Sequence, residues 1–421
     1  MPTIAIVGLG YVGLPLSLQF AKGGATVLGF DVDQSKTNSL NSGKSYIKHI
    51  ATSDVAAARD KKLFEATTDF TRIQEADAVI ICVPTPLNKY REPNLSFVLD
   101  TGKVIAPHIK SGAAVILEST TYPGTTEGVL RDVLEQGSGL KAGHDFHLAF
   151  SPEREDPGNP DSKVASIPKV VGGLTPACLE AAIKIYSLAI EQIVPVSSCA
   201  AAEATKLTEN IFRSVNIALV NELKVIYHKM GIDIWEIIEA AKTKPFGFMA
   251  FYPGPGLGGH CIPIDPFYLT WKAREFGLHT RFIELAGEIN TSMPDYVVTR
   301  VSEALNDHSK AVRGSRILIV GLAYKANVDD MRESPSLVLI EKLEAQGAKV
   351  DYNDPYVPVI PHTREHNRLT GRRSQPISKE YDCIVIATAH QEYNGAEIAR
   401  LGIPVVDSRR LVPPGPNIYQ A

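Results

Sequence analysis

The sequence predicts an α/β protein with two doubly wound parallel-sheet domains, joined by a central helical domain that contains a long helix. Three observations predict this fold class. Strand–helix–strand patterns occur near both ends of the chain, the strongest helical pattern lies between them, and 421 residues are too many for one compact core. We expect domains over residues 1–200, 201–300 and 301–421.

The composition is that of an ordinary folded protein and argues against several partners. The chain is 44% hydrophobic and 21% charged, and its net charge of −4 gives no signal for binding polyanions. The basic cluster Arg364, Arg368, Arg372 and Arg373 lies in a polar stretch, where a solvated loop is favoured over a nucleic-acid patch. No apolar run approaches the length of a membrane span. We expect neither nucleic acid nor a membrane as a partner.

The cysteines argue against a disulfide framework and against a zinc site. They are odd in number, widely spaced and free of any CxxC pair: Cys82, Cys178, Cys199, Cys261 and Cys383. This usage fits a reducing compartment, and the apolar N-terminal segment MPTIAIVGLGYVGLPL lacks the basic leader of a signal peptide. We therefore expect a cytoplasmic protein without a metal site.

The segment TIAIVGLGYVGLPLSLQFAKGGATVLGFDVD predicts a dinucleotide site of the Rossmann type. It reads as a buried strand, a glycine turn, an amphipathic helix and a second strand that ends in an acid. Gly8, Gly10 and Gly13 satisfy GxGxxG, and Asp31 follows Gly10 by 21 residues. Such glycines allow a tight turn, close approach of a pyrophosphate and close helix packing. Asp31 would accept hydrogen bonds from a ribose 2′-OH, which favours NAD over NADP. Glycines in an unrelated turn are the alternative.

A second α/β pattern follows near the C-terminus, from SRILIVGLAYK through AKVDYNDP and YDCIVIATA to IPVVDS. It has only Gly321 of the glycine pattern, and Lys325 lies just beyond the turn. We expect this Rossmann-like domain to bind a different phosphorylated ligand, with the lysine charge replacing part of what the glycines do. A duplicated domain that has lost its ligand is the alternative.

Residues 203 to about 230 predict a long amphipathic helix. Its apolar stripe contains Leu207, Ile211, Val215, Ala218 and Leu219. Its polar face contains Lys206, Asn210, Arg213 and Ser214. Such a helix can join two domains, and it can also form a dimer interface, because Phe212 and Ile217 give it a further apolar face.

Six segments together resemble the UDP-glucose/GDP-mannose dehydrogenases, which are NAD-dependent enzymes that oxidise a nucleotide sugar twice at C6. The segments cover nearly the whole chain in the family's order: GLGYVGLPL, ESTTYPGTT, SPERE, EATKLTENIFRSVN, GPGLGGHCIPIDP and GLAYKANVDDMRESPS. The resemblance implies an NAD-dependent UDP-sugar 6-dehydrogenase. It also implies a homodimer or higher homo-oligomer formed through the central helix.

The segment GPGLGGHCIPIDP, residues 254–266, surrounds one thiol, Cys261, with glycines and prolines. Oxidation of a primary alcohol to an acid removes two hydrides, and a thiol can hold the intermediate aldehyde covalently. Only about 3% of an ordinary cysteine is thiolate at pH 7, so the loop must activate it. A small buried hydrophobe is the alternative. For the adjacent His260, a structural or substrate-contact role is favoured over a Cys/His dyad.

The resemblance implies roles for five catalytic residues besides Cys261, which matches the family nucleophile in GGxCxxxD. Asp265 is expected to act as the general base of thioester hydrolysis, and Lys206 to stabilise the oxyanion or alkoxide. Asn210, one helical turn beyond Lys206, supports the same site. Thr120 and Glu153 match family positions that arrange a catalytic water and the proton transfers.

The two binding sites are expected to share some of these residues. The cofactor site is expected to contain Gly8, Gly10, Tyr11, Val12, Gly13, Asp31, Thr85, Thr120 and Arg332. The substrate site is expected to contain Arg154, Lys206, Asn210, Phe251, Tyr252, Gly258 and Lys325.

One departure from the glucose-specific pattern bears on the substrate. Where relatives have SPEFxxE, this chain has SPEREDPGNP, so the role of the second glutamate is not carried over to Glu155. SPER and GGHC resemble the branch that acts on N-acetylated sugars, and we expect UDP-N-acetyl-D-glucosamine. Arg154 would donate to the acetamido carbonyl, unless it pairs with Glu153 or Glu155. UDP-N-acetylmannosamine, UDP-N-acetylgalactosamine and UDP-glucose stay open as substrates.

Two other functions compete with this interpretation. A single-step hydroxyacid dehydrogenase has a similar N-terminal domain but does not need Cys261. A non-catalytic UDP-sugar sensor would bind both ligands and produce no NADH.

Overall fold

The computed structural model describes residues 1–48, 50–88, 90–154, 165–259, 262–363 and 365–421. Glu155, His260 and Cys261 therefore lie outside the described residues. The chain divides into two compact units. Unit 1 comprises Met1–Glu209 and Phe267–His279, and unit 2 comprises Asn210–Pro266 and Thr280–Ala421. The domain boundaries expected from the sequence stay a prediction.

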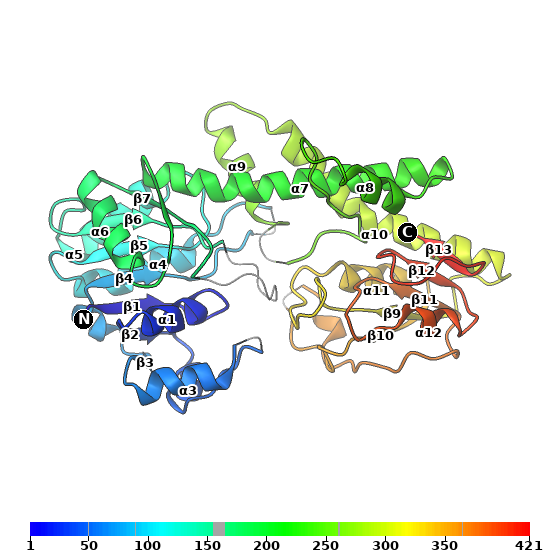
Figure 1. The fold of residues 1–421 in the computed structure, drawn as a ribbon, viewed down its shortest axis with the longest axis horizontal. Coiled ribbons are helices and arrows are strands. Elements are labelled where there is room, and N and C mark those ends of the chain that lie inside the picture. The colour runs from blue at the N-terminus through cyan, green and yellow to red at the C-terminus, as the bar shows by residue number, and fades with distance from the viewer. Residues whose placement is uncertain (49, 89, 155–164, 260–261, 364) are drawn as a thin grey trace. The chain divides into compact units, whose positions relative to one another are not determined.

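Unit 1 is built on an eight-stranded sheet with the order β3-β2-β1-β4-β5-β6-β7-β8 (Figure 1). The first six strands have the order of a dinucleotide-binding sheet. All neighbouring strands in it are parallel except β6 and β7, which pair antiparallel with Phe150 opposite Gly172. The strands are β1 Thr3–Val7, β2 Thr26–Phe30, β3 Phe64–Thr67, β4 Ala78–Ile81, β5 Ala114–Leu117, β6 His147–Phe150, β7 Lys169–Gly173 and β8 Ile193–Val196.

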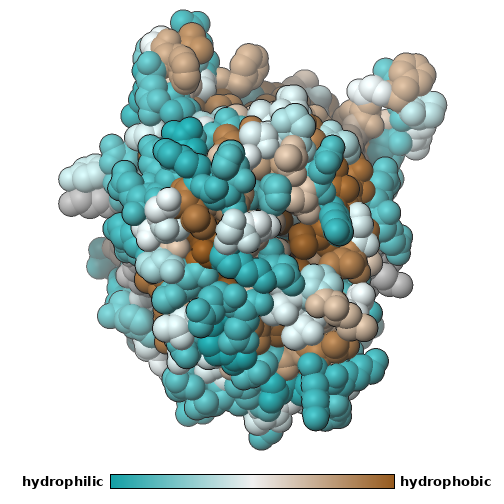
Figure 2. Space-filling model, turned by 90° about the vertical axis from the view of Figure 1, so that its left-hand side faces the viewer, coloured by the Kyte–Doolittle hydropathy of each residue, from teal (hydrophilic) through white to brown (hydrophobic). Residues whose placement is uncertain are grey.

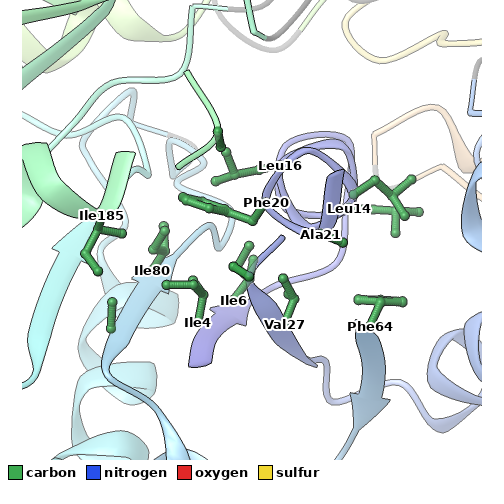
Figure 3. Close-up of a cluster of buried hydrophobic side chains, with 14 of the residues drawn as sticks. Ile4, Ile6, Leu14, Leu16, Phe20, Ala21, Val27, Phe64, Ile80 and Ile185 are labelled. Atoms are coloured by element: carbon green, nitrogen blue, oxygen red, sulfur yellow. The ribbon is translucent and has the colours of Figure 1, made fainter. Parts of the chain in front are cut away.

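Apolar side chains from the sheet and its helices form the core of unit 1. Figure 3 shows Ile4, Ile6, Val27 and Ile80 on the strands facing Phe20 and other residues of helix α1, Gly13–Lys22. The other helices that lie wholly within unit 1 are α2 Gln34–Asn41, α3 Thr52–Asp60, α4 Ser96–Ile105, α5 Arg131–Ser138 and α6 Pro176–Tyr186. Short 3₁₀ and π turns occur at Phe70–Glu75, Ala106–His108 and Thr126–Leu130.

The turn between β1 and α1 depends on two glycines. Gly8 has φ +94°, and a Cβ on it would lie 2.6 Å from the Cys82 carbonyl oxygen at the end of β4. A Cβ on Gly13 would lie 1.9 Å from the Gly8 carbonyl oxygen. Gly10 differs, because no heavy atom lies within 4 Å of the position its Cβ would take. The loop is thus closed around Gly8 and Gly13 and open at Gly10.

Unit 2 contains a five-stranded parallel sheet with the order β10-β9-β11-β12-β13. This is the second common order of doubly wound sheets, in which the first strand again lies next to a reversal of strand order. The strands are β9 Arg316–Val320, β10 Lys349–Asn353, β11 Cys383–Ile386, β12 Val405–Asp407 and β13 Ile418–Gln420. The helices of this unit are α8 Ile234–Ala241, α10 Arg281–Asp307, α11 Pro335–Ala345 and α12 Gly395–Ala399, with a 3₁₀ turn at Asn367–Leu369.

The long helix predicted from residue 203 to about 230 is α7, Cys199–Lys229, and the shorter α9 is Asp265–Arg274. Both helices contribute residues to each unit. The predicted apolar stripe of α7 is only partly buried. Leu207 and Ala218 are buried, whereas Leu219 is 49% exposed. The two sheets and the long helix confirm the fold class predicted from the sequence. Part of the apolar surface of α7 is exposed in the described structure.

The face of the molecule drawn in Figure 2 is mostly hydrophilic, with hydrophobic residues in small groups between polar ones. Among the described residues, no helix has both the length and the hydropathy needed to cross a bilayer.

The two glycines of the first turn give a matched pair of stability tests. Gly13→Ala should destabilise the protein by about 1–3 kcal/mol, because the new methyl group overlaps the Gly8 carbonyl and forces α1 away from β1. Gly10→Ala should change stability by no more than about 0.5 kcal/mol, since its methyl group meets open space. Denaturant unfolding of both variants measures the difference. Equal losses in the two variants would contradict this packing argument.

Candidate functional site

The glycine loop of unit 1 has the geometry of a dinucleotide site. It lies between β1 and β4, where the strand order reverses and where such sheets bind ligands. The open space at Gly10 lets a pyrophosphate approach the backbone. Asp31 directly follows β2, and its carboxylate accepts hydrogen bonds from the backbone N–H groups of Leu9 (3.1 Å) and Asp33 (3.0 Å). The loop therefore fits NAD, and the Asp31 carboxylate lies at the end of β2 beside it.

Two further side chains, those of Lys36 and Tyr46, contact Asp31 or the glycine loop next to it. The Lys36 ammonium lies 3.2 Å from the Asp31 carboxylate. Tyr46 donates a hydrogen bond to the Leu9 carbonyl oxygen, and burial followed by the negative charges of Asp31 and Asp33 raises the pKa of Tyr46 above its usual value. Tyr46 therefore stays a neutral donor and fixes the loop.

Three further expected cofactor residues lie near the same strand ends. Val12 is the N-cap residue of α1, and Tyr11 packs against the core beneath it. Thr85, which follows β4, is buried, and its carbonyl oxygen accepts a 2.7 Å hydrogen bond from the Tyr268 hydroxyl. Arg332, the fourth, belongs to unit 2 and pairs with Asp330 at 2.6 Å.

Thr120 lies on the loop after β5, and a buried carboxylate from α7 holds that loop. Glu203 accepts hydrogen bonds from the backbone N–H groups of Gly124 (2.6 Å) and Thr126 (3.0 Å). The hydroxyls of Thr126 (2.7 Å) and Thr121 (3.3 Å) donate to the same carboxylate. Burial raises the pKa of Glu203 to about 7, although these hydrogen bonds oppose the shift. Glu203 thus ties the Thr120 loop to the helix that carries Lys206.

Glu153 and Arg154 follow β6. The Glu153 carboxylate accepts a hydrogen bond from the backbone N–H of Arg154 (2.7 Å) and lies 3.3 Å from the Lys169 ammonium. The Arg154 guanidinium contacts Glu209 on α7 at 2.7 Å and donates to the Pro168 carbonyl oxygen at 2.7 Å. Among the described residues, the carboxylate that pairs with the Arg154 guanidinium is therefore Glu209, whereas Glu153 accepts from the Arg154 backbone N–H.

Lys206, Asn210 and Asp265 form the part of the expected catalytic set that the structure describes most closely. Lys206 and Asn210 are four residues apart on α7 and so share one face of it. The Asn210 amide donates a 2.6 Å hydrogen bond to the carboxylate of Asp265, the first residue of α9. Asn210 is 3% exposed, Asp265 2% and Lys206 9%. Within the described part of the chain, the Lys206 ammonium forms no hydrogen bond or ion pair.

The segment that leads to Cys261 is anchored to the loop that carries Lys325. The Gly259 N–H donates to the Arg332 carbonyl oxygen at 3.0 Å. A Cβ on Gly258 would lie 2.5 Å from the Tyr324 Cβ, next to Lys325. The structure thus places Gly258 and Gly259 against the segment that contains Lys325 and Arg332, which lies far along the chain.

The aromatic residues expected in the substrate site have protein contacts of their own. Phe251 packs against Phe212 with ring centres 5.7 Å apart. Tyr252 stacks on Trp235 at 5.6 Å, and its hydroxyl donates to Glu239 at 2.7 Å. The Tyr252 side chain is therefore directed to α8.

The second sheet repeats the switch-point geometry with a different polar centre. Gly321 has φ +89°, and a Cβ on it would lie 2.4 Å from the Thr388 carbonyl oxygen after β11. Asp354, after β10, accepts hydrogen bonds from the N–H groups of Leu322 (2.6 Å) and Ala323 (2.9 Å) and pairs with buried His390 at 3.0 Å. This carboxylate thus holds two backbone N–H groups of the loop that follows Gly321.

Sequence reasoning missed the buried charged residues around the site: Glu118, Lys169, Glu203, Asp354 and His390. The sequence contained an indication of a role for two of them, Glu203 and Asp354. Glu203 lies three residues before Lys206 on the same helix, and Asp354 ends its strand as Asp31 ends β2. Glu118 and Lys169 stand next to or within apolar strands, where a charged residue that is buried needs a partner.

The two sheets together define a nucleotide-binding α/β protein with a dinucleotide site in unit 1. Comparison with known proteins extends this to a family. Residues 2–190 match the NAD binding domain of the UDP-glucose/GDP-mannose dehydrogenase family, residues 200–292 its central domain, and residues 318–421 its UDP binding domain. The chain belongs to this family. It is an NAD-dependent oxidoreductase that acts on UDP-sugars.

Individual relatives cover almost the whole chain. A UDP-N-acetyl-D-glucosamine 6-dehydrogenase of Pseudomonas aeruginosa is 38% identical over 95% of this chain and 94% of its own. An NDP-N-acetyl-D-galactosaminuronic acid dehydrogenase of Ralstonia solanacearum is 35% identical over 97% and 95%. The structure of a UDP-D-ManNAc dehydrogenase of Pyrococcus horikoshii superposes with a TM-score of 0.90 at 32% identity, over 99% of this chain and 98% of that one.

The buried carboxylate of Glu203 makes a prediction about stability and pH. Its folded pKa of about 7 lies above the usual 4.5, so it binds more protons in the folded state, and its ionisation lowers stability as pH rises from about 4.5 to 7. Glu203→Gln replaces one acceptor oxygen by a donor that faces N–H groups, which should cost about 1–3 kcal/mol. Because the variant lacks the titration, its deficit relative to wild type should be larger at pH 5 than at pH 8.

Denaturant unfolding at the two pH values measures this deficit, with Glu180→Gln on the exposed side of α6 as the control. A Glu203→Gln deficit that grows with pH would contradict the sign of the shift.

Proposed function

We propose that the chain oxidises the C6 hydroxyl of UDP-N-acetyl-D-glucosamine twice, to the uronic acid, through covalent intermediates on Cys261. The observation that carries the proposal is the buried hydrogen bond between Asn210 and Asp265. Asp265 lies four residues after Cys261, so this bond fixes one end of the cysteine segment to α7. The proposal also includes a cytoplasmic location and the three domains 1–200, 201–300 and 301–421.

NAD⁺ would supply the hydride acceptor of each oxidation. The residues that would hold it are Gly8, Gly10, Tyr11, Val12, Gly13, Asp31, Thr85, Thr120 and Arg332. Between the oxidations, the Cys261 sulfur adds to the aldehyde carbon and forms a thiohemiacetal. Loss of the second hydride converts this adduct into a thioester. Water then attacks the thioester carbon, the C–S bond breaks, and the acid leaves with the thiol restored. The overall reaction consumes two NAD⁺ and one water.

The described residues divide the remaining tasks. Lys206, a buried cation without a described partner, is suited to stabilise the alkoxide and then the oxyanion, because an unpaired buried charge gains most from an anionic substrate group. Asp265, held by Asn210, accepts the proton of the hydrolytic water. Thr120 and Glu153 hold that water and pass protons. Lys325, Phe251, Tyr252 and Gly258 contact the UDP-sugar.

The choice of sugar rests on Arg154 and on the relatives. Two similar proteins are named as UDP-N-acetyl-D-glucosamine 6-dehydrogenases, while others are named for the mannosamine or galactosaminuronic acid compounds. The Arg154 contacts with Glu209 and Pro168 use three of the five N–H donors of the guanidinium. Glu209 therefore orders Arg154 so that a remaining N–H can donate to an acetamido carbonyl.

The substrate assignment predicts the order of kcat/KM in a panel of UDP-sugars. Wild type should prefer UDP-N-acetyl-D-glucosamine over its galactosamine and mannosamine epimers and over UDP-glucose. Arg154→Leu should lower the ratio of kcat/KM for UDP-N-acetyl-D-glucosamine to kcat/KM for UDP-glucose by at least about 10-fold, because leucine cannot donate a hydrogen bond to the acetamido carbonyl. Arg131→Leu, which removes an exposed arginine paired with Asp132, is the control. A wild-type enzyme that prefers UDP-glucose would overturn the substrate assignment. An Arg154→Leu variant with the wild-type ratio of kcat/KM values would overturn only the role of Arg154.

We also propose a homodimer formed through α7. Phe212, Leu219 and Ile226 are 47%, 49% and 46% exposed, and they recur every seven residues along the helix. This spacing places them on one side, as in helices that pack against one another. A second copy of the same chain offers an identical stripe, so a two-fold axis would bury both stripes at once.

Charge placed on this stripe should therefore separate the subunits. Leu219→Glu is expected to reduce the mass in solution to that of a 45.7 kDa monomer, measured by light scattering after gel filtration. Val104→Glu, at a 47% exposed apolar residue of α4, should leave the assembly intact. A wild-type monomer, or a dimer unaffected by Leu219→Glu, would contradict an interface on α7.

A further inference from the structure

Three charged residues from three neighbouring strand ends form a buried cluster in unit 1. The Lys169 ammonium lies 3.0 Å from Glu118 Oε1 and 3.3 Å from Glu153 Oε2. Lys169 is 4% exposed and Glu118 1% exposed. The Tyr186 hydroxyl donates to Glu118, and the Lys169 ammonium lies 5.3 Å from the centre of the Tyr186 ring. Lys169 is thus the cation between two carboxylates.

The topology of the sheet explains how Lys169 reaches this position. Glu118 directly follows β5, and Glu153 follows β6, so both lie at the carboxyl edge of parallel strands. Lys169 begins β7, which runs antiparallel to β6 with Phe150 opposite Gly172. Continuing this register places Glu153 opposite Lys169. The antiparallel strand therefore brings a lysine to the edge where the expected catalytic loops begin.

Glu118 also connects this cluster to Thr120, which lies two residues further along the same loop. Of the three charged residues, Glu153 is the most accessible, at 17% of its side chain, whereas the Lys169 side chain is 5% exposed and that of Glu118 is buried completely. Lys169 therefore contacts Glu153 from the protein interior, and its own side chain is too deeply buried to contact a substrate.

We propose that Lys169 is a positioning residue of the oxidation, which holds the Glu153 carboxylate in place and ionised, with Glu118 as its anchor. The inference rests on the proposed function, because the role of Glu153 belongs to that proposal. Without the cation, two carboxylates would share a buried site, and Glu153 would take up a proton at higher pH.

Among the residues that the structure describes, the other titratable groups that face the ammonium are the Cys82 thiol after β4 and the Tyr186 phenol on α6. Burial, and then the charge of Glu118, raises the pKa of both groups well above their usual values, so both stay neutral in ordinary assay buffers. Burial also raises the pKa of Glu118, against the effect of Lys169. Of the two carboxylates that Lys169 contacts, Glu153 is the more accessible, at 17% of its side chain, so the inference concerns the ionisation of Glu153.

Lys169→Met tests the inference in the full-length enzyme, with NAD⁺ and the best UDP-sugar of the panel. The kcat should fall at least about 10-fold, since positioned acid–base groups contribute about 10²–10⁴-fold. The KM values for both substrates should change by less than about threefold, because Lys169 is buried beneath Glu153. The acidic limb of the kcat/KM profile should move to higher pH, and Lys169→Arg should return it toward the wild-type position.

A second neutral variant and a double variant make the outcome decisive. Lys169→Gln retains hydrogen-bond donors to both carboxylates without charge and carries the same expectation if the methionine variant does not fold. In a Glu153→Gln background, Lys169→Met should lower kcat little further, because both changes act on one group. Lys184→Met, at an exposed lysine of α6, is the matched control.

A folded neutral variant with an unmoved acidic limb and wild-type kcat would overturn the inference. A lower kcat with an unmoved limb would also overturn it, because a merely structural role gives that result. Neither result affects the production of NADH from the UDP-sugar by the wild-type enzyme, which tests the proposed function. Failure of this inference is therefore distinguishable from failure of the proposed function.

Discussion

A charge removed from water must find its partner inside the protein, and this constraint organises the carboxyl edge of the eight-stranded sheet. Glu203 is fully buried and takes its donors from the loop after β5. Lys169 is buried as well and takes its acceptors from the residues after β5 and β6. These contacts join segments that the sheet alone would leave as independent loops. Since one unmatched partner in such a pair is costly, the loops are fixed where Thr120 and Glu153 lie.

The same constraint distinguishes the two sheets, although both place a glycine and an acid at a reversal of strand order. In unit 1, Asp31 accepts from Leu9 and Asp33 and pairs with Lys36, which is partly exposed. In unit 2, Asp354 is enclosed by backbone N–H groups and by His390, with the ring nitrogens of His390 reaching Asp354 and the Asn327 N–H. The first arrangement leaves its acid beside a partly exposed lysine, and the second uses its acid to hold the loop that carries Lys325.

Local patterns were enough to predict the fold class, because each sheet begins with a strand, a glycine turn and a helix in that order along the chain. The glycine fingerprint and Asp31 were predictable for the same reason, as was the long helix α7. The hydrogen bond between Asn210 and Asp265 joins residues that are 55 positions apart in two different motifs. Only the family resemblance assigned both residues to one site, and it did not predict that they pair.

Contacts without a local pattern could not be predicted. Nothing in the residues near Lys169 indicates that β7 runs antiparallel to β6, and this reversal is what places Lys169 beside Glu153. The partner of Arg154 was missed for a related reason. Glu209 was grouped with neither face of α7, and the acids adjacent in sequence, Glu153 and Glu155, were considered in its place. Tertiary pairing of charges decided both cases.

The account depends most on a covalent intermediate at Cys261, and peptide mass spectrometry of the Asp265→Asn enzyme tests it directly. This variant lacks the base for hydrolysis, so quenching it during reaction with NAD⁺ and UDP-N-acetyl-D-glucosamine should show the acyl group of the uronic acid on the peptide that contains Cys261. The adduct should be absent when NAD⁺ is omitted. An acyl group on a different residue, or acid formation at the wild-type rate by Cys261→Ser, would contradict the account.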